Sequence, residues 1–179
     1  MAMNKYLSVI TVNINELNAP IKRHRIAEWI RKHDPHICCL QETHLRTKDL
    51  HRLKVKGWKQ VFQSNGQKKI AGIAILISDK IDFQRRAIKR DPDGHFIILK
   101  GRIHQEDISI VNIYAPNIGA PKHIKKILKD FKKDIERNTT IVRDFNTPLS
   151  KTDRSSKQNI EKDIVSLNNI LDEMDLTDI

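Results

Sequence analysis

The sequence predicts a fold that mixes α-helices with β-strands, of the α/β or α+β class. Apolar residues gather in several runs of about 5 to 8, the length of strands buried in a core. Three other segments place their apolar residues at helical spacing instead. With 179 residues, the chain fits a single domain, because domains hold roughly 100 to 200 residues.

The expected strands follow the apolar runs. They cover residues 6–14, 37–41, 58–62, 70–77, 96–103 and 108–114. The sequence Asp-Pro-Asp-Gly at 91–94 combines residues that favour a turn. Residues 105–107 join two alternating segments, so residues 96–114 are predicted to form an antiparallel hairpin.

The expected helices alternate with these strands or follow them. The first begins near Pro20, because proline is tolerated in a first turn, and ends before Asp34 and Pro35. The second, residues 122–137, has an apolar face opposite a face of lysines. This basic face is either simply solvated or contacts phosphate or anionic lipid. The third helix covers residues 160–174.

The last residues of the sequence carry no polar tail and no Gly or Pro cap. Leu176 and Ile179 look like the entry to another buried strand. Residues 1–179 are therefore expected to form a single but incomplete domain. An incomplete sheet exposes an unpaired edge, so the expected state is a monomer with a tendency to aggregate.

The composition is basic and typical of a globular protein. Lys and Arg number 33 against 22 Asp and Glu, which gives a formal net charge of +11. This surplus favours a polyanion as partner, with nucleic acid ahead of an anionic membrane. Apolar residues make up 39% and charged residues 31%, which argues against disorder. No stretch approaches the roughly 18 apolar residues of a membrane helix, so no membrane partner is expected.

Two features indicate an intracellular chain that is not secreted. Cys38 and Cys39 are neighbours in an apolar run, where adjacent side chains of a strand point to opposite faces, so both are expected to stay reduced. The N-terminus has no small-residue cleavage site and therefore no expected secretory signal. The predicted location is the nucleus, the cytoplasm or both.

Polar residues recur where the apolar runs end. They are Asn13, Asn15, Glu42, Tyr114, Asn117, Asp144 and Asn146. Strand ends are where a rigid scaffold presents catalytic groups. Carboxylates such as Glu42 and Asp144 can hold Mg²⁺, and asparagine amides or the Tyr114 hydroxyl can donate to phosphate oxygens. Taken singly, Asn and Asp are also ordinary turn formers.

The order of these residues and their neighbours resembles a known family. Four segments resemble the successive motifs of the exonuclease–endonuclease–phosphatase superfamily: 13–15 (Asn-Ile-Asn), 41–44 (Gln-Glu-Thr-His), 112–117 (Asn-Ile-Tyr-Ala-Pro-Asn) and 144–148 (Asp-Phe-Asn-Thr-Pro). Residues 21–25, 89–91 and 115–121 resemble more closely the endonuclease domains of mammalian LINE-type retrotransposons. The resemblance runs from about Tyr6 to Ile179.

The resemblance implies a four-layered αββα sandwich, two facing sheets flanked by helices, here without its C-terminal strands. It implies a Mg²⁺-dependent endonuclease, with Mn²⁺ as an alternative metal, that nicks target DNA to prime reverse transcription. The implied partner is DNA. His44, Asn117 and Arg154 match positions near the DNA in this family.

The resemblance also implies roles for the strand-end residues. Glu42 matches the metal ligand, and Asn13 and Asp144 match residues that hold metal or nucleophile in place. Asn146 and Tyr114 match groups that stabilise the strained phosphate. The implied reaction is an in-line attack by water on a phosphodiester, which requires charge neutralisation, a positioned base and a stabilised leaving group.

Three departures from the family pattern argue against activity. The sequence contains no Asp-His dipeptide, the pair that supplies the family's general base, and losing such a base slows a reaction on the order of 10²- to 10⁴-fold. Glu16 and Arg143 stand where the family has glycine. The expectation is a truncated, inactive endonuclease. The alternatives are a non-enzymatic remnant that binds nucleic acid weakly and a phosphoesterase acting on a small molecule, so the sequence leaves enzymatic activity open.

Overall fold

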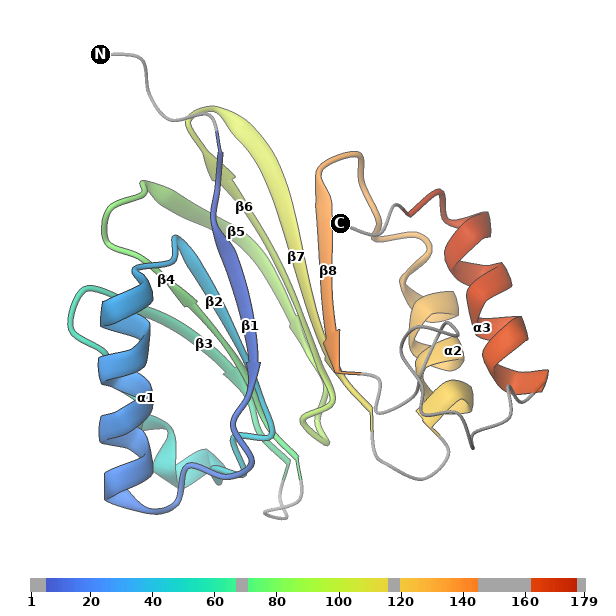
Figure 1. The fold of residues 1–179 in the computed structure, drawn as a ribbon. Coiled ribbons are helices and arrows are strands. Elements are labelled where there is room, and N and C mark those ends of the chain that lie inside the picture. The colour runs from blue at the N-terminus through green and yellow to red at the C-terminus, as the bar shows by residue number, and fades with distance from the viewer. Residues whose placement is uncertain (1–5, 67–70, 116–119, 145–161, 177–179) are drawn as a thin grey trace. The chain divides into compact units, whose positions relative to one another are not determined.

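The computed structural model describes residues 6–66, 71–115, 120–144 and 162–176. They fall into two compact units, one of Met1–Tyr114 with Asn138–Arg143 and one of Ala115–Arg137 with Asp144–Ile179. Strands dominate the first unit and helices the second (Figure 1). In chain order the elements are β1 (Val9–Asn13), α1 (Pro20–His33), β2 (Ile37–Gln41), the 3₁₀-helix η1 (Thr47–Arg52), β3 (Gln60–Ser64), β4 (Ile73–Ile77), β5 (Phe83–Arg90), β6 (Phe96–Ile103), β7 (Glu106–Tyr114), α2 (Ala120–Phe131), β8 (Thr139–Asp144) and α3 (Lys162–Glu173).

The described strands form two four-stranded sheets, which confirms the predicted mixed α/β class. The first sheet has the order β1-β2-β4-β3, with β1 parallel to β2 and the other neighbours antiparallel. The second has the order β5-β6-β7-β8, and β6 pairs with both β5 and β7 in antiparallel fashion. In the parallel pair, Asn13 lies opposite Gln41, so the C-terminal ends of β1 and β2 meet at one edge of the sheet.

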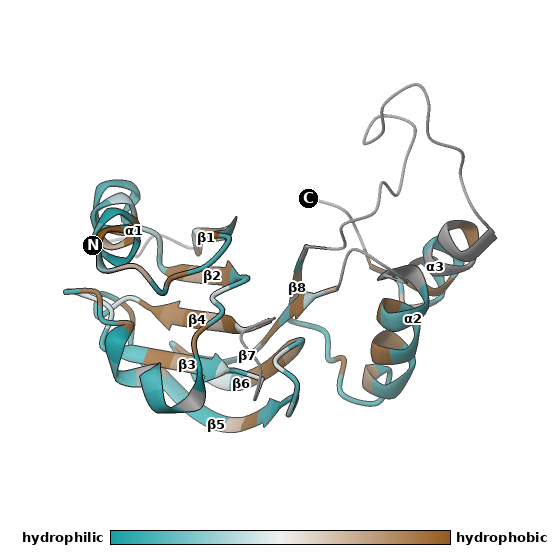
Figure 2. Cartoon of the chain, turned by 90° about the horizontal axis from the view of Figure 1, so that it is seen from below, coloured by the Kyte–Doolittle hydropathy of each residue, from teal (hydrophilic) through white to brown (hydrophobic). Residues whose placement is uncertain are grey.

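The two sheets face each other across a buried core. Alternate residues of the first sheet, among them Cys39, Ile73 and Ile75, pack there with Ile97 and Leu99 of β6. Figure 2 shows α1 on one side of the first sheet and the second sheet on its other side. Each such buried aliphatic side chain stabilises the fold by about 1.5–3 kcal/mol. The first unit therefore consists of one helix layer and two sheet layers.

The other face of the first sheet is covered by α1. Ile26 and Ile30 of this helix pack in a second core cluster with Leu76 of β4. The helix has the bounds that the sequence predicts. Pro20 occupies its first turn, and Asp34 ends it in a left-handed conformation with a φ of 49°.

The two cysteines lie on opposite faces of β2, as predicted. Both are free and buried. Cys39 belongs to the core between the sheets and Cys38 to the core under α1. Burial raises the pKa of Cys38 to about 12. Burial, followed by the neighbouring Cys38, raises the pKa of Cys39 as well. Both thiols therefore stay protonated at neutral pH.

The sequence does not predict β5, because this strand is polar. Within β5, whose residues are all described, Phe83 alone is buried. The strand lies at the edge of the second sheet, where one side meets solvent, so no apolar alternation is needed. A register shift between Arg85 and Ala87 adds a bulge. Charges and bulges on an edge strand discourage pairing with another chain.

The predicted hairpin of residues 96–114 is confirmed as the pair β6 and β7. Its turn, however, lies at His104 and Gln105, whose φ values are 49° and 69°, and not at residues 105–107. Strand β7 consequently begins at Glu106. The other predicted strands overlap β1, β3 and β4 with shifted ends, and η1 was not expected.

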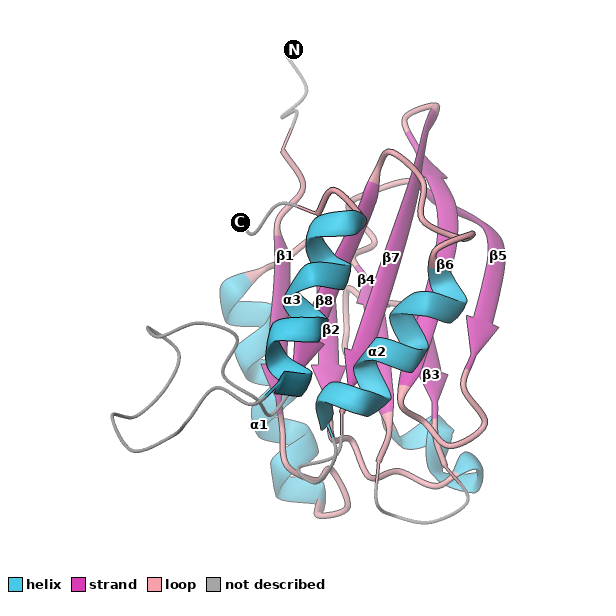
Figure 3. Cartoon of the chain, turned by 90° about the vertical axis from the view of Figure 1, so that its right-hand side faces the viewer, coloured by secondary structure: helices cyan, strands magenta, loops and turns pink. Residues whose placement is uncertain are grey.

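The second unit contains α2 and α3, which lie side by side (Figure 3). Ile124, Leu128 and Phe131 of α2 and Ile170 of α3 are buried. Most of the lysines on the other face of α2 are exposed, which leaves both interpretations of this basic face open. The helix ends at Phe131, earlier than the predicted residue 137. No helix among the described residues is both long enough and apolar enough to span a membrane.

Candidate functional site

The C-terminal ends of β1 and β2 bring two of the predicted site residues into contact. Asn13 Nδ2 donates a hydrogen bond of 3.0 Å to Glu42 Oε1. The Oδ1 atom of Asn13 accepts a hydrogen bond of 3.0 Å from the backbone N–H of Asn15. Because both ends of the amide are bound, Asn13 holds one oxygen of the Glu42 carboxylate in a fixed direction.

The backbone around Glu42 is strained, and hydrogen bonds from the loop after β1 hold it in place. Glu42 and His44 have φ values of 54° and 52°, in the left-handed region. The carbonyl of Glu42 accepts from the N–H of Glu16 at 2.8 Å, and the carbonyl of Thr43 accepts from Leu17 at 2.9 Å. A non-glycine residue in this region costs on the order of 1–3 kcal/mol and persists where its surroundings fix it, commonly at functional sites.

His44 lies beside Glu42 on the same loop. Its Nε2 atom is 3.9 Å from Glu42 Oε2. This nitrogen is buried and, among the described residues, makes no hydrogen bond. A buried polar atom without a partner costs about 1–3 kcal/mol, so a water or a hydrated ion between the imidazole and the carboxylate would stabilise the site. Carboxylate oxygens suit Mg²⁺, which usually retains several waters, so these residues fit such an ion.

A buried polar network lies under the site and joins the two sheets. Gln41 Nε2 donates to Asn112 Oδ1 at 2.8 Å. Asn112 Nδ2 donates to the carbonyls of Leu40 at 3.2 Å and Ala74 at 3.0 Å. Gln41 and Thr11 also exchange hydrogen bonds. No role was expected for Gln41 or Asn112, although a polar residue in each of the apolar runs 37–41 and 108–114 indicates a buried hydrogen bond.

The second sheet contributes Tyr114, the last residue of β7. Its backbone N–H donates to the carbonyl of His95 at 2.8 Å. The rings of Tyr114 and His95 are stacked, with centroids 6.3 Å apart and an interplanar angle of 11°. Asp91 Oδ2 accepts from the backbone N–H of His95 at 2.9 Å and lies 3.1 Å from its Nδ1. Sequence reasoning gave Asp91 no role beyond the matched segment 89–91 and the turn at 91–94, and it missed His95, which lies outside the matched segments.

Hydrogen bonds between backbone groups connect the loops of the two sheets at this end of the first unit. Thr43 N–H donates to Gly72 O at 3.0 Å, and Gly72 N–H donates to Gly94 O at 3.2 Å. A Cβ on Gly72 would lie 2.4 Å from Thr43 Oγ1, and its φ is 128°. Glycine is therefore required there. The loop carrying Glu42 and the turn carrying His95 thus belong to one connected edge.

The turn before β6 also holds a group of potential metal ligands. Ligand atoms of Asp91, Asp93 and His95 lie within 4.8 Å of one another, and no other such group occurs in the part of the chain that the structure describes. Asp91 Oδ2 is already bound to His95. The first unit therefore offers acidic donors at both Glu42 and this turn.

Glu16 and Arg143, which stand where the family has glycine, differ in backbone conformation. Glu16 has a φ of 81°, a conformation that favours glycine, and its Oε1 accepts a hydrogen bond from Asn18 Nδ2. The side chain therefore folds back onto its own loop. Arg143 lies inside β8 with an ordinary φ and is half-buried. Backbone strain thus accompanies the substitution at Glu16 and not the one at Arg143.

The remaining predicted residues stand apart from this description. Asp144 is the last residue of β8. Asn117, Asn146 and Arg154 lie outside the described residues. The site that the structure describes thus consists of Asn13, Glu42 and His44 on the first sheet, and of Tyr114 with its supporting turn on the second.

Known proteins share this fold. A model of the Endonuclease/Exonuclease/phosphatase family matches residues 10–169. Among curated proteins, a DNA-(apurinic or apyrimidinic site) endonuclease of Dictyostelium discoideum is 27% identical over 117 residues, which cover 63% of this chain and 31% of that protein. The chain therefore spans less than a third of the length of this relative.

Solved structures give the same result for the fold. An AP endonuclease from Archaeoglobus fulgidus superposes with a TM-score of 0.68 at 22% identity, covering 94% of this chain and 71% of that chain. The endonuclease domain of TRAS1, a telomere-specific non-LTR retrotransposon, superposes with a TM-score of 0.66 at 16% identity and with the same two coverages, 94% and 71%.

Proposed function

The chain belongs to the endonuclease/exonuclease/phosphatase family, and on that premise we propose that it is a metal-dependent DNA endonuclease domain of a mammalian LINE-type retrotransposon. Such a domain nicks target DNA to prime reverse transcription, and we expect this chain in the nucleus, the cytoplasm or both. The observation that carries the proposal is the position of Glu42. Its carboxylate is held by Asn13 and faces His44 at the end of β2.

The described residues suit the cleavage of a phosphodiester. A bound Mg²⁺ or Mn²⁺ ion would supply charge neutralisation at the phosphate. Glu42 would hold the ion, a role that the resemblance also implies for Asp144, and Asn13 keeps the Glu42 carboxylate oriented. Tyr114 would donate its hydroxyl to a phosphate oxygen, a role that the resemblance also implies for Asn146, which lies outside the described residues. His44 would bind a water beside the carboxylate, because its Nε2 atom lacks a hydrogen bond among the described residues.

We further propose that this chain alone cleaves DNA poorly. Its sequence holds no Asp-His dipeptide, and a missing general base lowers a rate on the order of 10²- to 10⁴-fold. The hydrogen-bonded pair Asp91 and His95 is a different arrangement, since the two residues are four positions apart in a turn. Glu16 adds a negative charge to the loop that pairs with Glu42. The missing Asp-His dipeptide and the charge of Glu16 would each lower activity without removing the metal site.

The test combines metal binding with DNA nicking. Calorimetry should show Mn²⁺ binding to the wild-type chain and at least a tenfold weaker interaction for Glu42→Gln. The matched control is Glu28→Gln, which removes an exposed carboxylate of α1 and should leave the affinity unchanged. Equal Mn²⁺ affinity in wild type and Glu42→Gln would overturn the assignment of Glu42.

Nicking is measured on supercoiled plasmid with Mg²⁺ or with EDTA. The wild-type chain is expected to nick no faster than Glu42→Ala. Robust nicking that depends on Glu42 would support the endonuclease and contradict the proposed low activity. Release of phosphate from a small soluble substrate, without any action on DNA, would favour the phosphoesterase instead.

A further inference from the structure

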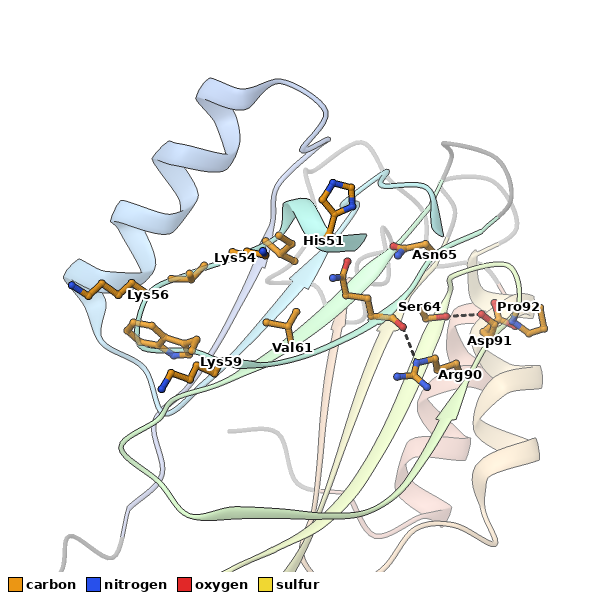
Figure 4. Close-up of a pocket in the computed structure, with 14 residues that line it drawn as sticks. His51, Lys54, Lys56, Lys59, Val61, Ser64, Asn65, Arg90, Asp91 and Pro92 are labelled. Carbon is orange, nitrogen blue, oxygen red and sulfur yellow. Dashed lines mark hydrogen bonds between the residues drawn. The ribbon is translucent and has the colours of Figure 1, made fainter. Parts of the chain in front are cut away.

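A groove of about 960 Å³ runs along β3 on the first unit, between the segment after η1 and the turn that follows β5. Val55 and Val61 contribute apolar surface to it. Lys54, Lys56 and Lys59 line it from the segment before β3, and Arg90 lines it from the end of β5. In Figure 4, Lys56 and Lys59 lie toward one end of the groove and Asn65 and Asp91 toward the other.

No carboxylate among the described residues neutralises the lysines of the groove. Lys54, Lys56 and Lys59 are exposed and form no ion pair with any described residue. The one carboxylate that lines the groove, Asp91, is bound to His95. Since opposing charges are lacking, the groove attracts an anionic chain more strongly than a neutral one.

The lysines stand on a fixed turn. Val55 and Trp58 form an isolated β-bridge, and the Trp58 N–H donates to Val55 O at 3.0 Å. The indole of Trp58 is buried, and its Nε1 donates to Pro35 O at 3.0 Å. The turn is therefore anchored to the core, and the lysines project from a rigid base, so less entropy is lost when they bind a ligand.

One end of the groove adjoins the candidate site. Asn65 lines the groove and lies 3.3 Å from Thr43, measured between Oδ1 and Oγ1, and Thr43 follows Glu42 directly. The Asp91 carbonyl accepts a hydrogen bond from Ser64 Oγ, and the Asp91 side chain binds His95 beneath Tyr114. The end of the groove at Asn65 therefore lies beside the loop that carries Glu42.

Nucleic acid fits this groove better than an acidic peptide. A peptide would bind β3 as an additional strand and would need the backbone groups of β3. The carbonyl of Gln63, next to the C-terminal end of β3, already accepts from Arg90 Nε at 2.8 Å, which hinders that mode. Phosphates require only the cations, and sugars and bases can rest on Val55 and Val61. The groove is concave and can hold a single strand, whereas a double helix presents a convex surface that does not enter it.

We propose that this groove binds a single nucleic acid strand through its phosphates, as an extension of the candidate site. That the strand continues from the candidate site into the groove rests on the proposed function, whereas binding of a strand in the groove does not depend on it. Three phosphate contacts on a single strand correspond to a salt-dependence slope of roughly 2 in log Kd against log salt concentration.

The experiment measures fluorescence anisotropy of a labelled 12-nucleotide oligo(dT) with the full chain, in EDTA so that no cleavage takes place. The variant is Lys54→Glu/Lys56→Glu/Lys59→Glu. Its matched control, Lys122→Glu/Lys126→Glu/Lys129→Glu on α2, changes three exposed lysines and has the same change in net charge. The groove variant is expected to bind at least tenfold more weakly and to lose about 2 from the salt slope, while the control keeps the wild-type slope. Circular dichroism melting checks that both variants fold.

The proposal is overturned if both variants lose the same affinity for oligo(dT), or if the groove variant binds oligo(dT) as tightly as the wild type. It is also overturned if the groove variant keeps its affinity for oligo(dT) but no longer binds a labelled oligoglutamate peptide that the wild type binds. Glu28→Ala, which removes an exposed carboxylate of α1, should bind oligo(dT) as the wild type does. If the groove variant fails to bind oligo(dT) while Mn²⁺ binding still depends on Glu42, the strand site and the metal site are both supported. Unchanged oligo(dT) binding combined with Mn²⁺ binding that depends on Glu42 would overturn the groove alone.

Discussion

Gln41 of the first sheet and Asn112 of the second are joined by a hydrogen bond of 2.8 Å inside an otherwise apolar core. Both side chains are almost completely buried. Asn112 also bonds to the carbonyls of Leu40 and Ala74, so one amide connects three strands. The pair sets the spacing of the sheets directly below Glu42.

Asn112→Ala should therefore destabilise the first unit strongly. It removes one partner of the Gln41 amide, which keeps its hydrogen bonds with Thr11, and the side-chain donor to two buried carbonyls. The expected loss is about 3 kcal/mol in the free energy of unfolding. Urea denaturation measures it. Asn138→Ala removes one exposed hydrogen bond to Asp107 and should cost less than about 1 kcal/mol. Equal losses for the two variants would mean that the buried network adds nothing to stability.

Glu16→Gly should stabilise the protein. Glycine adopts the φ of 81° without steric strain, so the free energy of unfolding should rise by about 1 kcal/mol. The same substitution at Glu28, an exposed position inside α1, should lower it by about 1 kcal/mol. Thermal melting of the two variants gives the opposite signs. A lower melting temperature for Glu16→Gly would show that the Asn18 contact outweighs the strain.

Gly72→Ala should be far more harmful than Gly57→Ala. Both glycines have positive φ, 128° and 96°, but a Cβ on Gly72 would collide with Thr43 while one on Gly57 meets nothing within 4 Å. Gly57→Ala should cost about 1–2 kcal/mol from strain alone, and Gly72→Ala at least about 1 kcal/mol more from displacing the Thr43 loop. Urea midpoints compare the two. Similar midpoints would refute the close packing at Thr43.

The pKa of Asp107 should lie below its ordinary value. A hydrogen bond from Arg102, and the charges of Arg102 and Arg86, favour its ionised form. A carboxyl whose folded pKa is depressed stabilises the fold above its unfolded pKa, and this contribution is lost as the pH falls through the folded pKa. An NMR titration of the side chain in Arg102→Gln should show a higher pKa than in wild type. Arg86→Gln, which removes the more distant guanidinium, should shift it less.

Sequence reasoning succeeded where burial sets the pattern. Strand β2 is buried along its whole length and most of β6 is buried, so apolar runs marked both exactly. It failed at β5, because an exposed edge strand has no need of apolar residues. In the site, motif order identified Asn13 and Glu42, which the structure joins. His95 escaped notice because its contacts with Asp91 and Tyr114 depend on a turn, which periodicity does not reveal.

The adjacent thiols of β2 make the molecule its own reporter of unfolding. Cys39 is enclosed between the sheets and Cys38 beneath α1. A thiol reagent can reach the first only when the sheets separate, and the second only when the helix lifts. The ratio of the two labelling rates therefore measures which layer opens first, without any introduced probe.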